Sequence, residues 1–222
     1  GLRANQALYD YSTAYGLPCI SGKDSMKNDS TRGGRKISIP PTLLFSAIAR
    51  LGDVDTAVTL DVKHAGDLVY VLGQTHDELG GSEYAAMQGG VDTTVPQVDA
   101  ATALKLYDAL SQATAAGLCR SVHTPALGGL GMALVRKCLG GRLGMHVDLK
   151  AVPAGAELDT AALLFAESNS RFVVTVAPAD RPAFEQVLQG NACACIGTVT
   201  QAPTLTVDAG SNSICAVPLD DL

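Results

Sequence analysis

The sequence lacks an excess of positive charge and a long apolar run, and from its opening residues we expect no secretory leader. Its 16 Lys and Arg residues face 22 Asp and Glu, which gives a formal net charge of −6. This balance argues against nucleic acids and anionic membranes as partners, because affinity for either depends on positive charge. The longest strongly apolar stretch, residues 43–49, contains Ser46 and is far too short to span a bilayer. Because the chain opens with neither a basic-then-apolar segment nor Met, we expect a cytoplasmic protein, present as an excised fragment or processed product.

The sequence also lacks the cysteine spacing of a metal site. No C-x-x-C pair is present, and a zinc site would need further Cys or His residues at ligand spacing around Cys193 and Cys195. These two residues lie two positions apart, so a strand would place both on one face. Six cysteines in 222 residues are too few for a dense disulfide framework. We therefore predict buried, reduced thiols and no metal site.

Apolar residues, by contrast, are abundant, and their spacing predicts an α/β fold. They make up 47% of the chain, which is enough to bury a substantial core and excludes a wholly disordered chain. From residue 67 onward, short apolar stretches alternate with stretches of helical periodicity, a pattern typical of a sheet covered by helices. The predicted strands are 68–72, 143–149, 171–176, 192–199, 203–207 and 213–217, and the predicted helices are 83–87, 97–116, 128–139, 160–165 and 180–188.

The part of the chain before residue 53 has a different character, and residues 53–66 connect it to the rest. Its predicted elements are a helix over 3–15 that ends at Gly16, a short strand over 17–20, a surface loop over 28–35 and a buried strand over 43–49. Beyond this part of the chain, capping residues predict where two helices begin. Thr94 and Gln97 have the spacing of a capping box, and Asp180 can cap the helix that follows it.

One candidate phosphate site lies at residues 22–25, which read Gly-Lys-Asp-Ser after a predicted strand. Gly22 lets the backbone approach a ligand, Lys23 supplies a point charge for phosphate, and Asp24 can hold a metal ion, with Ser25 closing the motif. The spacing is not that of a P-loop. A polar turn is the alternative interpretation.

Two glycine-rich helix starts are further candidates. One is Gly-Gly-Ser at 80–82, and the other is the pair Gly128 and Gly129. Backbone N–H groups at helix starts favour anions, although paired glycines before a helix also occur for steric reasons. His123 precedes the second start and is either a catalytic residue or a hydrogen-bonded structural residue at a strand end. Residues 167–170 form either a polar edge of an active site or a loop.

Several motifs, in this order, resemble the phosphoribosylformylglycinamidine synthase family. The most specific similarity lies at residues 9–11, Tyr-Asp-Tyr, and at 16–28, Gly-Leu-Pro-Cys-Ile-Ser-Gly-Lys-Asp-Ser-Met-Lys-Asn. Further similar segments lie at 40–47, 66–67, 72–73, 79–84, 128–130 and 164–171. The resemblance implies an aminoimidazole ribonucleotide synthase-like C-terminal domain over residues 60–222. It also implies that residues 1–55 form the end of an N-terminal-type domain.

The enzymes of this family are ATP-dependent C–N ligases. They convert formylglycinamide ribonucleotide, glutamine and water to formylglycinamidine ribonucleotide in de novo purine synthesis, with ATP and Mg²⁺. The resemblance implies two partners, the remaining synthase half and a glutaminase domain or subunit. It assigns no catalytic residue, and the residues nominated for nucleotide or phosphate binding are Gly22, Lys23, Asp24, Ser25, Gly80, Gly81, Ser82, His123, Gly128 and Gly129.

The chain departs from the family at the second glycine-rich start. Where relatives have Asp, Ser and Asp, this sequence has Thr124, Ala126 and Leu127, and none of these side chains can replace an anionic Mg²⁺ ligand. We therefore expect no tightly held nucleotide or metal, and the alternative to an active ligase is a non-catalytic structural half. We also expect a homodimer of the fragment, held by apolar side chains of a strand over 37–49, namely Ile37, Ile39, Leu43, Phe45 and Ile48.

Overall fold

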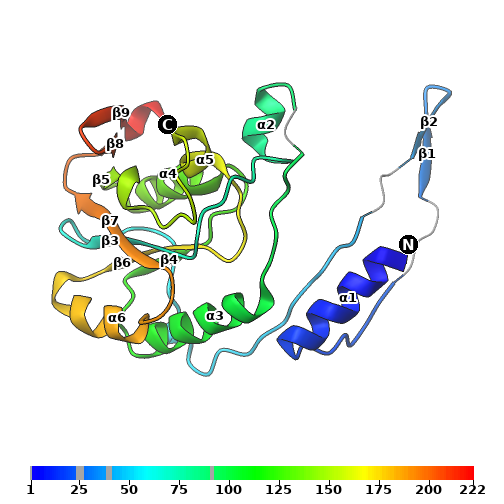
Figure 1. The fold of residues 1–222 in the computed structure, drawn as a ribbon, viewed down its shortest axis with the longest axis horizontal. Coiled ribbons are helices and arrows are strands. Elements are labelled where there is room, and N and C mark those ends of the chain that lie inside the picture. The colour runs from blue at the N-terminus through cyan, green and yellow to red at the C-terminus, as the bar shows by residue number, and fades with distance from the viewer. Residues whose placement is uncertain (1, 24–27, 39–41, 91–92) are drawn as a thin grey trace. The chain divides into compact units, whose positions relative to one another are not determined.

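The computed structural model describes residues 2–23, 28–38, 42–90 and 93–222 of the chain (Figure 1). The chain forms two compact units, Gly1–Gly52 and Asp53–Leu222. The second unit contains the hydrophobic core, whereas no described residue of the first unit is buried. None of the described helices is long and apolar enough to cross a membrane.

The first unit contains a helix and a two-stranded hairpin. α1 (Leu2–Tyr15) confirms the helix predicted over 3–15, and Gly16 ends it with a φ of +63°. β1 (Asp29–Arg32) and β2 (Arg35–Ser38) pair antiparallel. The prediction of a surface loop over 28–35 is therefore wrong, because this segment forms a hairpin. Gly33 and Gly34, with φ of +56° and +74°, supply the positive-φ turn that matches the twist of a hairpin.

Two strands predicted in the first unit do not form. Residues 17–20 are not a strand, nor are the described residues 42–50, and Ile39 lies outside the described residues. The apolar side chains of the second stretch are exposed, with Leu44 90% and Ile48 91% accessible. Apolar composition indicates a capacity for burial, but a strand also needs a neighbour for its N–H and C=O groups. In the described part of this unit β1 and β2 pair only with each other, so this stretch has no such neighbour.

The second unit is built on a seven-stranded sheet in the order β4-β6-β3-β7-β5-β8-β9. β5 and β8 run parallel, and every other neighbouring pair is antiparallel. This arrangement confirms the α/β class and all six predicted strands beyond residue 67, and β4 is an addition at the edge. The bounds are β3 (Leu68–Leu72), β4 (Ser121–His123), β5 (Gly144–Asp148), β6 (Phe172–Val176), β7 (Cys193–Thr200), β8 (Thr204–Ala209) and β9 (Asn212–Pro218).

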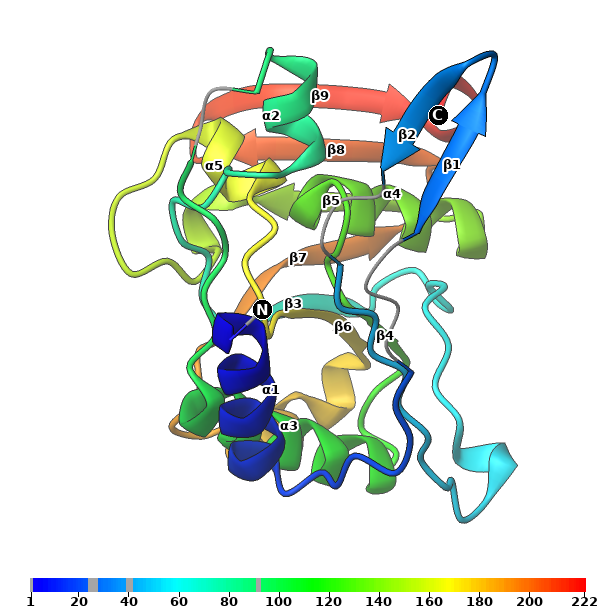
Figure 2. The ribbon, with the colours of Figure 1, turned by 90° about the vertical axis from the view of Figure 1, so that its right-hand side faces the viewer.

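Helices cover both faces of this sheet (Figures 1 and 2). Alternate residues of β3 divide between two cores: Val69 and Val71 pack with α4 and α5, whereas Tyr70 and Leu72 pack with α3 and α6. The helices are α2 (Glu83–Met87), α3 (Ala100–Ala115), α4 (Gly129–Gly141), α5 (Thr160–Phe165) and α6 (Arg181–Val187), with 3-10 turns η1 (Val54–Thr56), η2 (Leu149–Ala151), η3 (Pro178–Asp180) and η4 (Leu219–Asp221).

Two predicted helix caps are wrong. α3 begins three residues later than predicted, because Asp99 caps it by accepting a hydrogen bond from the Thr102 N–H. The N–H of Gln97 is used elsewhere, in a 2.9 Å hydrogen bond to the buried carboxylate of Glu78. At α6 the side chain of Asp180 makes no capping hydrogen bond, because this residue belongs to η3 with a helical φ of −89° and ψ of −5°.

Candidate functional site

The two glycine-rich helix starts of the second unit converge on one internal carboxylate. Oε1 of Glu167 accepts a hydrogen bond from the N–H of Gly128, at 2.8 Å, and another from the N–H of Glu83, at 3.1 Å. Gly128 is the N-cap of α4, and Glu83 is the first residue of α2. Such N–H groups lie at the positive end of a helix and favour an anion. The carboxylate of Glu167 therefore satisfies the anion preference of both starts from within the chain.

Glycine at these starts also has a packing role. A Cβ on Gly129 would lie 2.7 Å from the carbonyl oxygen of Ala166, and a Cβ on Gly80 would lie 2.7 Å from backbone atoms of Thr94. Both distances are below van der Waals contact, and the obstructing atoms are backbone. The steric interpretation of the paired glycines therefore holds at these two positions. Gly81, with a φ of +76°, has open space around its missing side chain.

Ser82 uses its hydroxyl within the chain. The side chain is buried, donates to the carbonyl oxygen of Leu79 at 2.6 Å and accepts from the N–H of Ala85 at 3.1 Å. This is the N-cap arrangement of α2. Ser82 thus holds the start of the five-residue helix in place.

The segment after Glu167 is fixed by a buried arginine. Arg171 is fully buried and donates through Nε to the carbonyl oxygen of Ser168 at 3.1 Å, through Nη1 to Oγ1 of Thr75 at 2.9 Å, and through Nη2 to the carbonyl oxygen of Ala166. The hydroxyl of Ser168 in turn accepts from the N–H of His76 at 3.1 Å. Residues 166–171 are therefore tied to the loop after β3 as well as to the helix starts.

The charge of Arg171 is kept although the side chain is buried. Burial lowers its pKa to about 10, and the nearby negative charge of Glu78 acts in the opposite direction. Glu78 is itself buried, and its Oε2 has no hydrogen-bond partner in the described part of the chain. At neutral pH a guanidinium therefore supports this loop beside a buried carboxylate.

His123 ends β4, the edge strand next to the start of α4. Its Nε2 is buried and has no hydrogen-bond partner among the described residues. Burial lowers its pKa, and the positive charges of Lys137 and Arg136 lower it further. The shift favours the neutral ring, and no hydrogen bond at Nε2 from the described residues supports the structural interpretation of His123.

The sequence-predicted site residues fall into separate groups. Gly22 and Lys23 lie exposed in the first unit, whereas Asp24 and Ser25 lie outside the described residues. The second unit holds Gly80, Gly81 and Ser82 before α2, and His123, Gly128 and Gly129 before α4. Glu167 links these last two groups, whereas the sequence pattern predicts only a loop or an active-site edge at this position.

No metal centre is seen in the part of the chain that the structure describes, where no group of three or more His, Cys, Asp or Glu residues could hold an ion. Thr124, Ala126 and Leu127 are exposed and supply no carboxylate where the family resemblance implies an Mg²⁺ ligand. These residues do not fit that ion. Burial raises the pKa of the thiols of Cys119, Cys138 and Cys193 to about 12.

All six cysteines are free, and burial differs among them. Cys119 and Cys138 are buried, and Cys193, Cys195 and Cys215 are half-buried. The prediction of buried thiols is wrong for Cys19, which is exposed. This residue lies in the first unit, where no described side chain is buried.

The fold and the site define a mixed α/β domain in which two glycine-rich helix starts share an internal carboxylate. Residues 64–210 match the family described as AIR synthase related protein, C-terminal domain. The chain belongs to this family.

The chain is also similar to characterised proteins. It is 33% identical over 218 residues to the phosphoribosylformylglycinamidine synthase subunit PurL of Deinococcus radiodurans, which takes in 96% of this chain and 29% of that protein. Thermotoga maritima PurL complexed with FGAR matches 95% of this chain and 35% of its own at a TM-score of 0.74 and 17% identity. The same protein complexed with ATP matches 75% of this chain and 27% of its own at a TM-score of 0.63 and 19% identity. These structures support the fold alone, since identity is below a quarter.

Proposed function

We propose that this chain serves as the C-terminal part of the second synthase half of a phosphoribosylformylglycinamidine synthase. The assembled enzyme would convert formylglycinamide ribonucleotide, glutamine and water to formylglycinamidine ribonucleotide with ATP and Mg²⁺. The observation that carries this proposal is the 33% identity to Deinococcus PurL across 96% of the chain. Because the chain spans only 29% of that relative's length, the activity belongs to a larger assembly that includes the other half and a source of ammonia.

Within that assembly we assign this chain a structural role rather than turnover. The anion-favouring N–H groups before α2 and α4 are already occupied by Glu167. Residues 124, 126 and 127 offer no carboxylate, so Mg²⁺ would lack its ligand here. The proposed nucleotide contacts are Gly22, Lys23, Asp24 and Ser25 in the first unit and the residues before α2 and α4 in the second unit. At the second group a phosphate would have to displace Glu167, so we expect no nucleotide to be held tightly by the chain alone.

A segment exchange tests the assignment. The 218 aligned residues of Deinococcus PurL are replaced by those of this chain, and formation of formylglycinamidine ribonucleotide is measured with ammonia as the nitrogen source. We expect product from the chimera and none from the isolated chain. A chimera that unfolds cooperatively but makes no product would refute membership in this enzyme.

The structural role is tested in the same chimera by His123→Gln. A supporting half predicts a kcat within a few-fold of the parent chimera for His123→Gln. A loss of kcat by a hundredfold or more would place His123 in the catalytic machinery. Calorimetric titration of the isolated chain with Mg²⁺–ADP measures its affinity for the nucleotide directly, and tight binding would overturn the structural role.

A further inference from the structure

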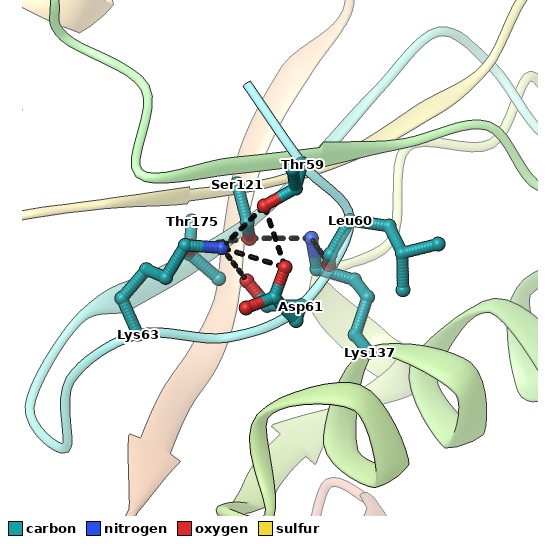
Figure 3. A network of polar contacts seen from close by, with 7 residues as sticks. All are labelled: Thr59, Leu60, Asp61, Lys63, Ser121, Lys137 and Thr175. Atoms are coloured by element: carbon teal, nitrogen blue, oxygen red, sulfur yellow. Dashed lines mark hydrogen bonds and ion pairs between the residues drawn. The ribbon is translucent and has the colours of Figure 1, made fainter. Parts of the chain in front are cut away.

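Lys137 is buried in the second unit, and no carboxylate of the described residues forms an ion pair with it. It lies on α4, is fully inaccessible, and its Nζ donates to the carbonyl oxygen of Leu60 at 3.0 Å and to the hydroxyl of Ser121 at 2.6 Å. Ser121 lies on β4 and shares a 2.6 Å hydrogen bond with Thr175 of β6 (Figure 3).

The number of partners matches a neutral amine rather than an ammonium. A neutral lysine amine has two N–H donors, and the site has two acceptors, the Leu60 carbonyl and the Ser121 hydroxyl. An ammonium has three donors, so one of them would lack an acceptor among the described residues. Burying a charge without a counterion is also far more costly than burying a hydrogen-bonded neutral group.

The titratable groups around Lys137 do not supply a free negative charge. Asp61 forms a 2.8 Å ion pair with Lys63, and the thiols of Cys119 and Cys138 stay protonated because burial raises the pKa of each to about 12. His123 carries no negative charge in either protonation state, and burial is the largest cause that lowers its pKa. Burial, followed by the charge of Lys63, lowers the pKa of Lys137 to about 7, against the opposing effects of Asp61, Cys138 and Cys119.

Of the two residues that Lys137 holds, Leu60 belongs to the segment that leads from the first unit into β3, and Ser121 belongs to β4. This segment, residues 59–63, has two further backbone links: the Thr59 carbonyl accepts from the Val122 N–H at 3.1 Å, and the Val62 N–H donates to the Lys137 carbonyl at 3.3 Å. A cavity of about 320 Å³ is lined by Thr59, Lys63 and other residues beside this network. Water can therefore reach the segment when it loosens.

We propose that Lys137 is a pH-operated latch for residues 59–63. As a neutral amine it holds the segment to β4 and α4, and uptake of a proton releases the segment into contact with water. The direction of the pH effect follows from the coupling between proton binding by Lys137 and release of the segment. The released lysine binds a proton more tightly than the latched one, so release becomes less favourable as the pH rises from about 7 toward 10.5. Below about pH 7 both states are protonated, and the dependence levels off.

The N–H groups of Val62 and Val122 report on the latch, because each is bonded across the held segment. Hydrogen exchange of these two amides is measured between pH 6 and 9 on the full chain and corrected for the intrinsic exchange rate. We expect the protection factors to rise about tenfold per pH unit between pH 7 and 9, which is the limit for one linked proton. A flat profile over that range in the wild type would overturn the latch.

Two variants and one matched control isolate Lys137. Lys137→Gln keeps two N–H donors but cannot titrate, and Lys137→Met removes the donors, so both are expected to lose the slope. Lys105→Gln is the control, since Lys105 also bonds a carbonyl, that of Gly190 at 2.9 Å, but on an exposed surface. It should keep the wild-type slope. A slope that persists in Lys137→Met would assign the effect to another group.

A direct titration keeps the test independent of the variants. The side-chain amine of Lys137 is followed by NMR in the wild-type chain with isotope-labelled lysine. A midpoint near pH 7 supports the latch, and a midpoint above pH 9 overturns it even if the variants fail to fold.

Discussion

Glu167 accepts a hydrogen bond from the N–H of Gly128 at 2.8 Å, although the two residues lie on different loops of the second unit. The same oxygen accepts from Glu83 at the start of α2, so one carboxylate joins two helix starts. An intramolecular anion is present at high effective concentration, and an external phosphate would have to displace it. This relationship supports the structural role that we propose for the chain, because the N–H groups at both helix starts already have an acceptor.

The first prediction concerns the charge of Glu167. Glu167→Gln keeps an acceptor oxygen but removes the negative charge, and we expect a loss of about 1 kcal/mol in the free energy of unfolding. Glu167→Ala removes both and should lose about 2 kcal/mol, because two N–H donors lose their partner. Urea unfolding measures both values. Asn169→Ala, an exposed change in the same loop, serves as the control, and equal stability of Glu167→Gln and wild type would show that the charge is irrelevant.

The second prediction concerns Arg171. Arg171→Met leaves the Thr75 hydroxyl and two carbonyls without their donor and leaves the buried Glu78 without its nearby cation, so we expect a loss of about 3 kcal/mol or more. Arg171→Lys keeps the charge but cannot reach all three acceptors, and its loss should be intermediate. The matched control is Arg142→Gln, which breaks an exposed 2.8 Å ion pair with Asp220 and should cost about 1 kcal/mol or less. Comparable losses for Arg171→Met and Arg142→Gln would contradict the argument.

The third prediction concerns stability against pH. Because folding lowers the pKa of Lys137 from 10.5 to about 7, the unfolded chain binds the extra proton between these values, and stability rises with pH across this window. Between pH 7 and 9 we expect a gain of about 1–3 kcal/mol in the free energy of unfolding of the wild type. Above pH 9 the gain is opposed, because the buried thiols of Cys119, Cys138 and Cys193 have a raised pKa of about 12 and the unfolded chain loses those protons first.

Lys137→Met serves as the comparison for this pH profile, since it removes the titrating group and keeps an apolar stem. Its stability should change little between pH 7 and 9. The prediction fails if wild type and Lys137→Met gain equally over this range. The low pKa of His123 affects only more acidic solutions, because its ordinary value is 6.5.

Much of the second unit could be predicted from local patterns, and its site could not. The run from Leu68 to Leu72 and the face of Ala103, Leu106 and Leu110 carry their own periodicity, so strand and helix follow from spacing alone. The start of α3 was misplaced because Glu78, 19 residues upstream, takes the N–H of Gln97. Glu167 contacts residues 39 and 84 positions away, and no local pattern records such a distance.

The burial of Lys137 could not be predicted from the sequence for a related reason. Lys137 follows the apolar positions of α4, where a lysine is normally expected to point toward solvent. Its burial depends on two acceptors from Leu60 and Ser121, which lie 77 and 16 residues away. The predicted strand over 43–49 does not form for the opposite reason. Its apolar residues are present, but β1 and β2 in the described part of the unit pair only with each other.

The last prediction concerns association. Leu43, Leu44, Phe45 and Ile48 are exposed at 57%, 90%, 62% and 91% in the first unit, so this stretch is available for a partner. Each such side chain gains about 1.5–3 kcal/mol on full burial, and residues with free N–H and C=O groups can add to another strand. We therefore expect the isolated chain to self-associate as a dimer, and residues 53–222 alone to be monomeric with an almost unchanged melting temperature. Light scattering over a dilution series measures the mass of both proteins. The double variant Phe45→Ser and Ile48→Ser in the full chain tests whether the apolar stretch is the interface.

A full chain that stays monomeric at concentrations well above micromolar would contradict the dimer, and dimerisation of residues 53–222 would assign the interface to the second unit.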